Sequence, residues 1–136
     1  MYVIDVNTSF GKRVDPDPRF TPAALCEELG RHTVARAFAF SQKGLHYSSC
    51  YGNAEALMVA YQYPALLPVA PHNPRESIGW QEEMNRILHA GVKILRFFPG
   101  QQGWSIASAH FRAILDYLQG SGIALMISTV ECPTGW

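Results

Sequence analysis

The chain has 136 residues, a length typical of one domain, and its 11 lysines and arginines balance its 11 aspartates and glutamates. A neutral chain without a basic stripe lacks the positively charged surface that binds nucleic acid. No apolar run reaches the ~18 residues that a membrane span needs. The start lacks a signal-peptide pattern, and the 3 cysteines form no CxxC motif, which favours reduced thiols in a cytoplasmic protein.

Five apolar runs of strand length alternate with helical stretches. They are rich in Val, Ile, Leu and Phe, which is typical of parallel strands covered on both faces. Their starts fall about thirty residues apart, the length of one βαβ unit. The predicted strands are Tyr2–Phe10, Val34–Ser41, Leu66–Ala70, Val92–Phe98 and Ile123–Val130.

The helical stretches between these runs carry start and stop signals. Thr21-Pro22 predicts an N-cap followed by proline at the first helical position. The other expected starts lie at capping residues, and the expected ends lie at proline or glycine. These starts are Asn53, Ser77 and Ser105, and these ends are Pro64, Gly91 and Gly120.

Two architectures fit five such units. One is an open, doubly wound sheet, which can be complete at this length, and the other is the first part of an eight-stranded barrel, which needs ~250 residues. The loop after the first strand has a single glycine, Gly11, so a nucleotide-binding open sheet has little support. In both architectures ligands bind beyond the carboxyl ends of the strands.

The first strand carries an unusual polar face. Strict alternation puts Asp5, Asn7 and Ser9 on one side and Ile4, Val6 and Thr8 on the other. Polar side chains on an inward face are costly to bury without partners. We therefore expect these three residues either to form the polar floor of a binding site or to satisfy one another near the end of the strand.

The segment Ile4–Gly11 resembles the opening strand of amidohydrolase-related, metal-dependent hydrolases, which normally read Asp-x-His-x-His. Further similar segments follow in the same order, namely Gly52-Asn53 with Tyr63-Pro64, Leu67–Ala70 with Asn73-Pro74, Gly91–Pro99 and Gly122–Ser128. The resemblance implies that residues 1–136 are one domain, the N-terminal portion of a TIM-type (β/α)₈ barrel. It predicts an α/β fold of five βα units with parallel strands, truncated after the fifth.

The sequence departs from the family at its metal ligands. The two histidines of the first strand fall on Asn7 and Ser9, and that of the fifth strand falls on Ser128. The resemblance implies a divalent metal, but neutral amide and hydroxyl oxygens bind zinc-type ions weakly. Asp5, Asn7 and Ser9 could offer oxygens to Mg²⁺ or Ca²⁺, but a site with a single carboxylate would bind such an ion weakly. We therefore assign no metal ligands.

Other candidate residues lie in the loops expected on the catalytic face. His72, in a stiff proline-flanked loop, His46, in a longer loop, and Glu131, after the fifth strand, are the candidate acid–base groups. Alternation puts Lys93 and Arg96 on opposite faces of the fourth strand. Arg96 lies nearer its carboxyl end, so we expect it either to bind a carboxylate substrate or to form an ion pair within the protein. The expected substrate-binding residues are Asp5, Asn7, Ser9, Arg96 and Ser128.

Three functions remain open. The resemblance implies an amidohydrolase-like or decarboxylase-like enzyme acting on a small carbonyl or carboxylate compound. The missing ligands favour a metal-free enzyme or a non-catalytic barrel that binds a small molecule. Five of eight barrel strands cannot close a barrel, so we also expect association of copies through the open sheet edges.

Overall fold

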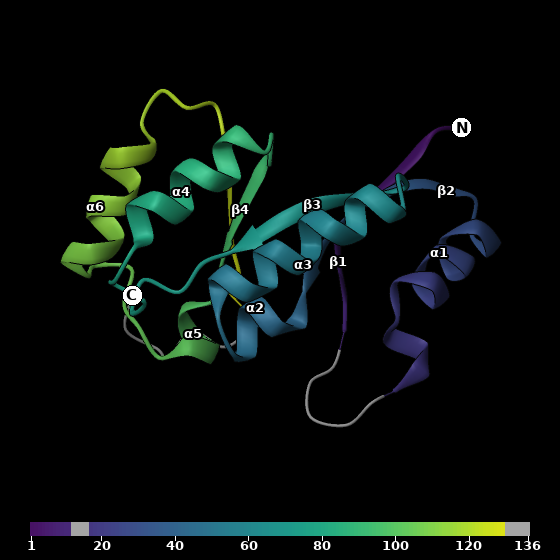
Figure 1. Cartoon of the computed structure of the whole chain (residues 1–136), viewed down its shortest axis with the longest axis horizontal. Helices are drawn as coiled ribbons and strands as arrows, with labels where there is room; N and C mark the ends of the chain where they lie inside the picture. Colours follow the sequence, from purple (N-terminus) through teal and green to yellow (C-terminus); the bar gives the residue numbers. More distant parts are fainter. Residues whose placement is uncertain (12–16, 130–136) are drawn as a thin grey trace.

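The computed structural model describes residues 1–11 and 17–129. Five parallel strands form one sheet in the order β1-β2-β3-β4-β5 (Figure 1). They are β1 (Val3–Phe10), β2 (Val34–Ser41), β3 (Leu66–Pro71), β4 (Ile94–Phe97) and β5 (Ala124–Ile127). The expected α/β fold of five βα units is confirmed.

The connections between the strands contain long helices and short helical turns. The long helices are α1 (Pro22–Arg31), α3 (Ser49–Gln62), α4 (Trp80–His89) and α6 (Ala109–Leu118). The short ones are the 3-10 helix η1 (Pro18–Phe20), α2 (Gln42–His46) and α5 (Pro99–Gln102). None of the helices in the described ranges is long and apolar enough to cross a membrane.

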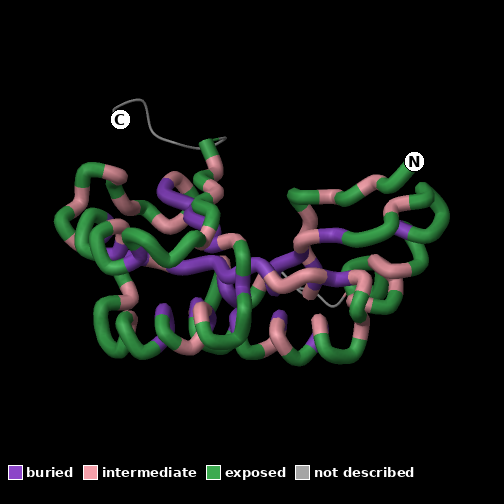
Figure 2. The backbone as a smooth tube through the Cα atoms, turned by 90° about the horizontal axis from the view of Figure 1, so that it is seen from above, coloured by how far each residue is buried: buried purple, intermediate pink, exposed green. Residues whose placement is uncertain are grey.

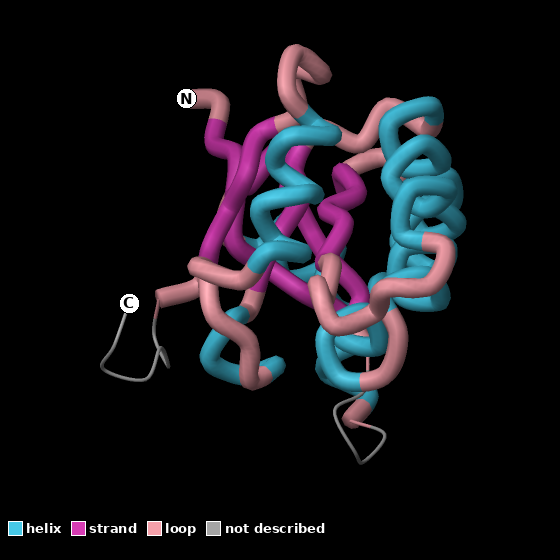
Figure 3. The backbone as a smooth tube through the Cα atoms, turned by 90° about the vertical axis from the view of Figure 1, so that its left-hand side faces the viewer, coloured by secondary structure: helices cyan, strands magenta, loops and turns pink. Residues whose placement is uncertain are grey.

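All four long helices pack on the same face of the sheet. One core cluster joins α4 and α6 to β3 and β4, and a second joins α1 and α3 to the first three strands. A third cluster, built on Phe40, Val69 and Phe98, includes no residue of these four helices and lies on the other face. In Figure 3 the column of helices stands beside the strands. We call the helix-covered side the convex face and the opposite side the concave face.

The sheet is therefore curled into a half-barrel. A doubly wound sheet has helices on both faces and a strand order that reverses, whereas here the order is sequential. Figure 2 shows the buried residues running through the middle, with the N-terminal end of the chain on the side away from the lower row of helices. Of the two architectures that fitted the sequence, the barrel type is confirmed and the open sheet is wrong.

The strand predictions hold to within a few residues, and the largest differences are in β5, where Ser128 and Thr129 lie beyond the observed strand, and in β4. Val92 was expected in the strand, but its N–H donates to the carbonyl of Ile87 at 3.1 Å, while Gly91 has φ +79°. This is the pattern of a Schellman helix end, so Val92 terminates α4 and packs in the convex core. The expected end of the fifth strand, at Val130, lies outside the described residues.

The expected caps are confirmed in one case and displaced in three. The Thr21 hydroxyl accepts the N–H of Ala24 at 3.2 Å, as the Thr-Pro pattern predicts. The predictions for Asn53, Ser77 and Ser105 are wrong, because the observed N-caps are Ser48, Gly79 and Ser108. Asn53 lies inside α3, where its amide donates to Glu83, and Ser105 forms a turn of its own before α6.

Candidate functional site

Arg96 places a buried cation on the concave face. Its neighbours in β4, Leu95 and Phe97, belong to the convex core. Only 9% of Arg96 is exposed, and burial lowers the pKa of its guanidinium from the ordinary value. Arginine nevertheless stays protonated in proteins. A positive charge therefore lies inside the curve of the sheet.

Two aromatic rings and one amide hold this guanidinium. Cζ of Arg96 lies 5.0 Å from the ring centroid of Phe40 and 4.8 Å from that of Phe98, within the range of cation–π interactions. Nη1 donates a 2.6 Å hydrogen bond to Oδ1 of Asn7. Nε is buried and has no hydrogen-bond partner in the described part of the chain. The guanidinium of Arg96 is thus held by contacts with uncharged side chains.

No carboxylate in residues 1–11 and 17–129 forms an ion pair with Arg96. The ion pairs there are Arg19–Asp17, Arg31–Glu28, His32–Glu28, Lys43–Glu55 and Arg86–Glu83. A buried charge without a counter-ion is costly, and such costs are found most often at functional sites. The arginine fork matches carboxylate and phosphate groups. The arrangement is therefore suited to binding a small anion.

Ser9, Gln42 and Ser128 extend the polar part of this site. The Ser9 hydroxyl accepts a 2.7 Å hydrogen bond from Nε2 of Gln42, the first residue of α2. Oε1 of Gln42 is buried without a described partner and could accept a hydrogen bond from a ligand. The Ser128 N–H donates to the carbonyl of Phe97 at 2.9 Å, which keeps the chain after β5 beside the end of β4.

Asp5 is set apart from the other polar residues of β1. The pairing with β2 is irregular here, because Asp5 is in register with Ala37 and Thr8 with Ala39. The strict alternation expected along this strand is therefore interrupted by a bulge. Ala37 belongs to the convex core, and Oδ1 of Asp5 accepts the backbone N–H of Asn7 at 2.9 Å. The expected grouping of three polar side chains is thus reduced to two.

His72 directly follows β3, at the carboxyl end of the strand where it was expected, but its ring lies on the convex side, away from Arg96. Its N–H donates to the carbonyl of Arg96 at 2.9 Å, which continues the strand pairing past β3. Its ring stands edge-on to that of Phe97, with centroids 6.5 Å apart. The residue is only 1% exposed, and burial lowers the pKa of the imidazole from 6.5 to about 4. At neutral pH it is an uncharged, buried ring.

His46, the other described residue that was expected to act as an acid–base group, is not near Arg96. His46 ends α2 and lines a groove of about 740 Å³ together with Phe10 and Val59. Those two residues belong to the convex core, so His46 faces the side away from Arg96. Glu131 lies outside the described residues.

The positions that correspond to the family's metal ligands do not suit a divalent cation. Oδ1 of Asn7 already accepts a hydrogen bond from Arg96, whose charge would repel a cation there. Ser9 and Ser128 would add only hydroxyl oxygens. The described residues include no group of three His, Cys, Asp or Glu side chains able to hold a metal ion.

Sequence reasoning missed the aromatic walls of this site, although a signal for them exists. Phe40 alternates with Ala39 and Ser41 along β2, and Phe98 has the same parity as Arg96 along the chain. Alternation applied to these strands would have put both rings on the face of Arg96. Gln42 could not have been found in this way, because it lies in a short helix that the sequence does not predict.

The contacts of Arg96 make the concave face suited to binding an anion. Asn7, Phe40 and Phe98 position a permanent cation toward the carboxyl ends of the strands, where parallel α/β proteins bind ligands. The resemblance to amidohydrolase-related proteins stays a prediction. No protein-family model and no curated protein matches the sequence.

Proposed function

We propose that this chain binds a small compound bearing a carboxylate on its concave face, with Arg96 as the anchor. The observation that carries the proposal is a buried guanidinium that lies against two neighbouring rings, donates to one amide and has no ion-pair partner in the described residues. A bound carboxylate would supply the missing counter-charge. The walls formed by Phe40 and Phe98 favour a ligand with an apolar or planar body.

A binding role has more support than hydrolysis. The two described histidines that were expected to act as acid–base groups, His72 and His46, lie on the side of the sheet away from Arg96. The amidohydrolase-like activity that the family resemblance implies stays a prediction. Release of product from small amides or esters by the purified chain would favour it over a purely binding role.

The proposal is tested by calorimetric titration with benzoate and benzamide, which share a ring and differ in charge. We expect benzoate to bind and the neutral benzamide to bind at least ten times more weakly, because only the carboxylate gains charge-assisted hydrogen bonds. Arg96→Met keeps the length and apolar packing of the side chain and removes its charge. It should weaken benzoate binding by about 10- to 100-fold.

The matched control is Arg36→Met, which removes an exposed arginine from β2. It should leave benzoate affinity within about twofold of the starting protein, because exposed charges contribute little to binding at a separate site. Equal affinity for benzoate and benzamide, or unchanged benzoate affinity in Arg96→Met, would refute the proposal.

A further inference from the structure

A second cavity, of about 350 Å³, opens on the convex side between the loop after β3 and the starts of α3 and α4. Its wall includes Ser49, His72, Glu76, Trp80, Glu82 and Glu83. This volume falls within the range of small-molecule sites in proteins. The cavity contains none of the residues that surround Arg96 and is independent of the function proposed above.

His72 is the unusual feature of this cavity. It is 1% exposed, and neither Nδ1 nor Nε2 has a hydrogen-bond partner in the described part of the chain. A buried polar group without a partner costs about 1–3 kcal/mol, so native proteins rarely retain one without a use for it. Burial keeps the pKa of this ring far below 6.5, at about 4. A neutral imidazole has one nitrogen that accepts a hydrogen bond, so the cavity contains an unused acceptor.

The carboxylates in the wall give the cavity an excess of negative charge. Glu83 is paired with Arg86 at 2.7 Å, and despite its burial the hydrogen bonds from Arg86 and Asn53 keep its pKa below 4.5. Among the described residues, the carboxylate of Glu76 accepts hydrogen bonds of 3.1 Å from only the N–H and the hydroxyl of Ser49. Both donors are uncharged, so they do not compensate the negative charge of Glu76.

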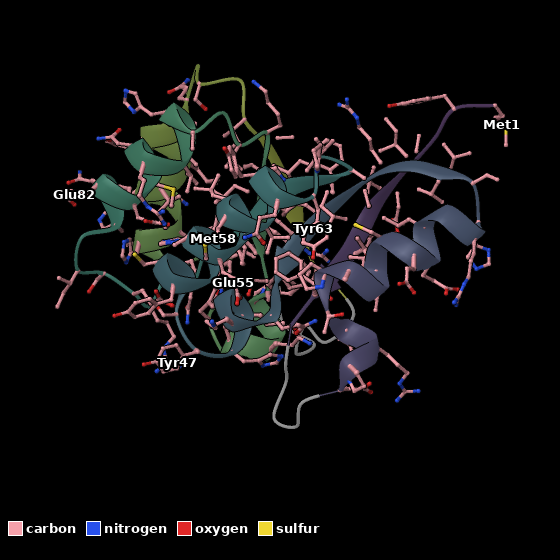
Figure 4. The ribbon with its side chains drawn as sticks, turned by 45° about the vertical axis from the view of Figure 1, so that its right-hand side comes forward. Met1, Tyr47, Glu55, Met58, Tyr63 and Glu82 are labelled. Atoms are coloured by element: carbon pink, nitrogen blue, oxygen red, sulfur yellow. The ribbon has the colours of Figure 1, made fainter. Side chains whose placement is uncertain are left out.

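The remaining carboxylate, Glu82, projects from the first turn of α4 at the surface (Figure 4) and forms no ion pair within the described ranges. With His72 neutral and Arg86 paired to Glu83, two unpaired carboxylates remain in the wall, those of Glu76 and Glu82. The unmatched charge of the cavity is therefore negative.

Trp80 and Ile78 supply the apolar part of the wall. The Trp80 ring packs between the rings of His110, at 5.4 Å, and Tyr117, at 5.2 Å, which fixes its orientation. An indole is the best aromatic partner for an organic cation. Ile78 is 97% exposed and could cover the hydrocarbon part of a ligand.

We propose that this convex-side cavity binds a small organic ammonium compound. Its –NH₃⁺ group donates to the free nitrogen of His72, its charge is balanced by Glu76 and Glu82, and its hydrocarbon part lies against Trp80 and Ile78. The three hydrogens of an ammonium group match an acceptor-rich site that a carboxylate would not enter.

The test is calorimetric titration with benzylamine and with neutral benzyl alcohol at pH 7, together with amide chemical shifts. We expect benzylamine to bind at least tenfold more tightly and to shift signals of the loop after β3 and of α4. Glu76→Gln should weaken it by about tenfold and His72→Phe by about fivefold. Glu82→Gln changes an exposed side chain and should weaken benzylamine binding by about two- to fivefold.

Two controls separate this site from the concave face. Glu27→Gln removes an exposed carboxylate of α1 and should leave benzylamine binding unchanged. Arg96→Met should weaken benzoate binding by about 10- to 100-fold and keep benzylamine binding, so each proposal can fail alone. Equal affinity for benzylamine and benzyl alcohol, or full benzylamine affinity in both Glu82→Gln and His72→Phe, would overturn the inference.

Discussion

At the scale of single residues, two unusual side chains lie on opposite faces of the sheet. Arg96 points to the concave face and His72 to the convex face, although their backbones are joined by a hydrogen bond of 2.9 Å. Burial disfavours the charged form of both groups and lowers both pKa values. The histidine responds by losing its proton, whereas the arginine cannot and must be stabilised by its surroundings.

The buried His72 should make stability depend on pH. Its folded pKa of about 4 lies below the ordinary 6.5, so the unfolded chain binds more protons between these values. The contribution to stability is fully present above pH 6.5 and is lost as the pH falls toward 4, by ~3 kcal/mol. Urea unfolding of the starting protein and His72→Phe across this range measures the difference. The exposed His89→Gln should keep the pH slope of the starting protein, and an unchanged slope in His72→Phe would contradict the assignment.

At the scale of elements, two close contacts fix the position of α2 against α3 and β3. A Cβ atom added at Gly52 would lie 2.2 Å from the backbone of Gly44, and one added at Gly44 would lie 2.5 Å from Pro71. Neither glycine has a positive φ, so the close packing of α2 against α3 and against Pro71 of β3, rather than turn geometry, requires them. This contact holds α2, and with it Gln42, next to the carboxyl ends of the strands.

Gly52→Ala should destabilise the chain by about 2–4 kcal/mol, because backbone atoms cannot move aside as a flexible side chain would. Gly30→Ala is the matched control, because Gly30 lies in α1 with nothing within 4 Å of an added Cβ. It should raise the free energy of unfolding by about 0.5–1 kcal/mol through helix propensity. Chemical denaturation measures both changes. Equal effects of the two substitutions would show that the contact between α2 and α3 is unimportant.

At the scale of the whole molecule, the half-barrel leaves both edges of the sheet unpaired among the described residues. β1 and β5 each pair on one side only. Apolar side chains are exposed on both strands, including Val6 at 51%, Leu125 at 43% and Ile127 at 36%. Open edges with apolar side chains favour pairing with other chains. We therefore propose that copies of this chain associate through these edges.

Sedimentation velocity over a range of concentrations should show association that increases with concentration. Ile127→Lys adds a charge to the outer strand and should shift the population toward monomer. Lys93→Gln, an exposed position just before β4, is the control and should not change association. A starting protein that stays monomeric at every concentration would contradict the proposal.

Much of the concave site could be predicted from the sequence, and the reasons are local. Alternation along β4 separates Arg96 from Lys93, and alternation along β1 turns Asn7 toward the interior of the curve. The position of His72 after the third strand was predicted, but the side of the sheet on which its ring lies was not. Continuing the alternation of β3 one residue past Pro71 would have put it beside Ala70 on the convex face.

The sequence by itself determined the alternation of strands and helices, the Thr21 cap and the parity of Arg96, because periodicity and capping depend on residues close together in the chain. Only the tertiary structure decided that the sheet curls with its helices on one face and that Asn7 meets Arg96, 89 residues away. It also decided that a bulge separates Asp5 from Asn7 and that His72 lies in a convex-side cavity. These features depend on how distant segments pack, and local sequence patterns do not specify such packing.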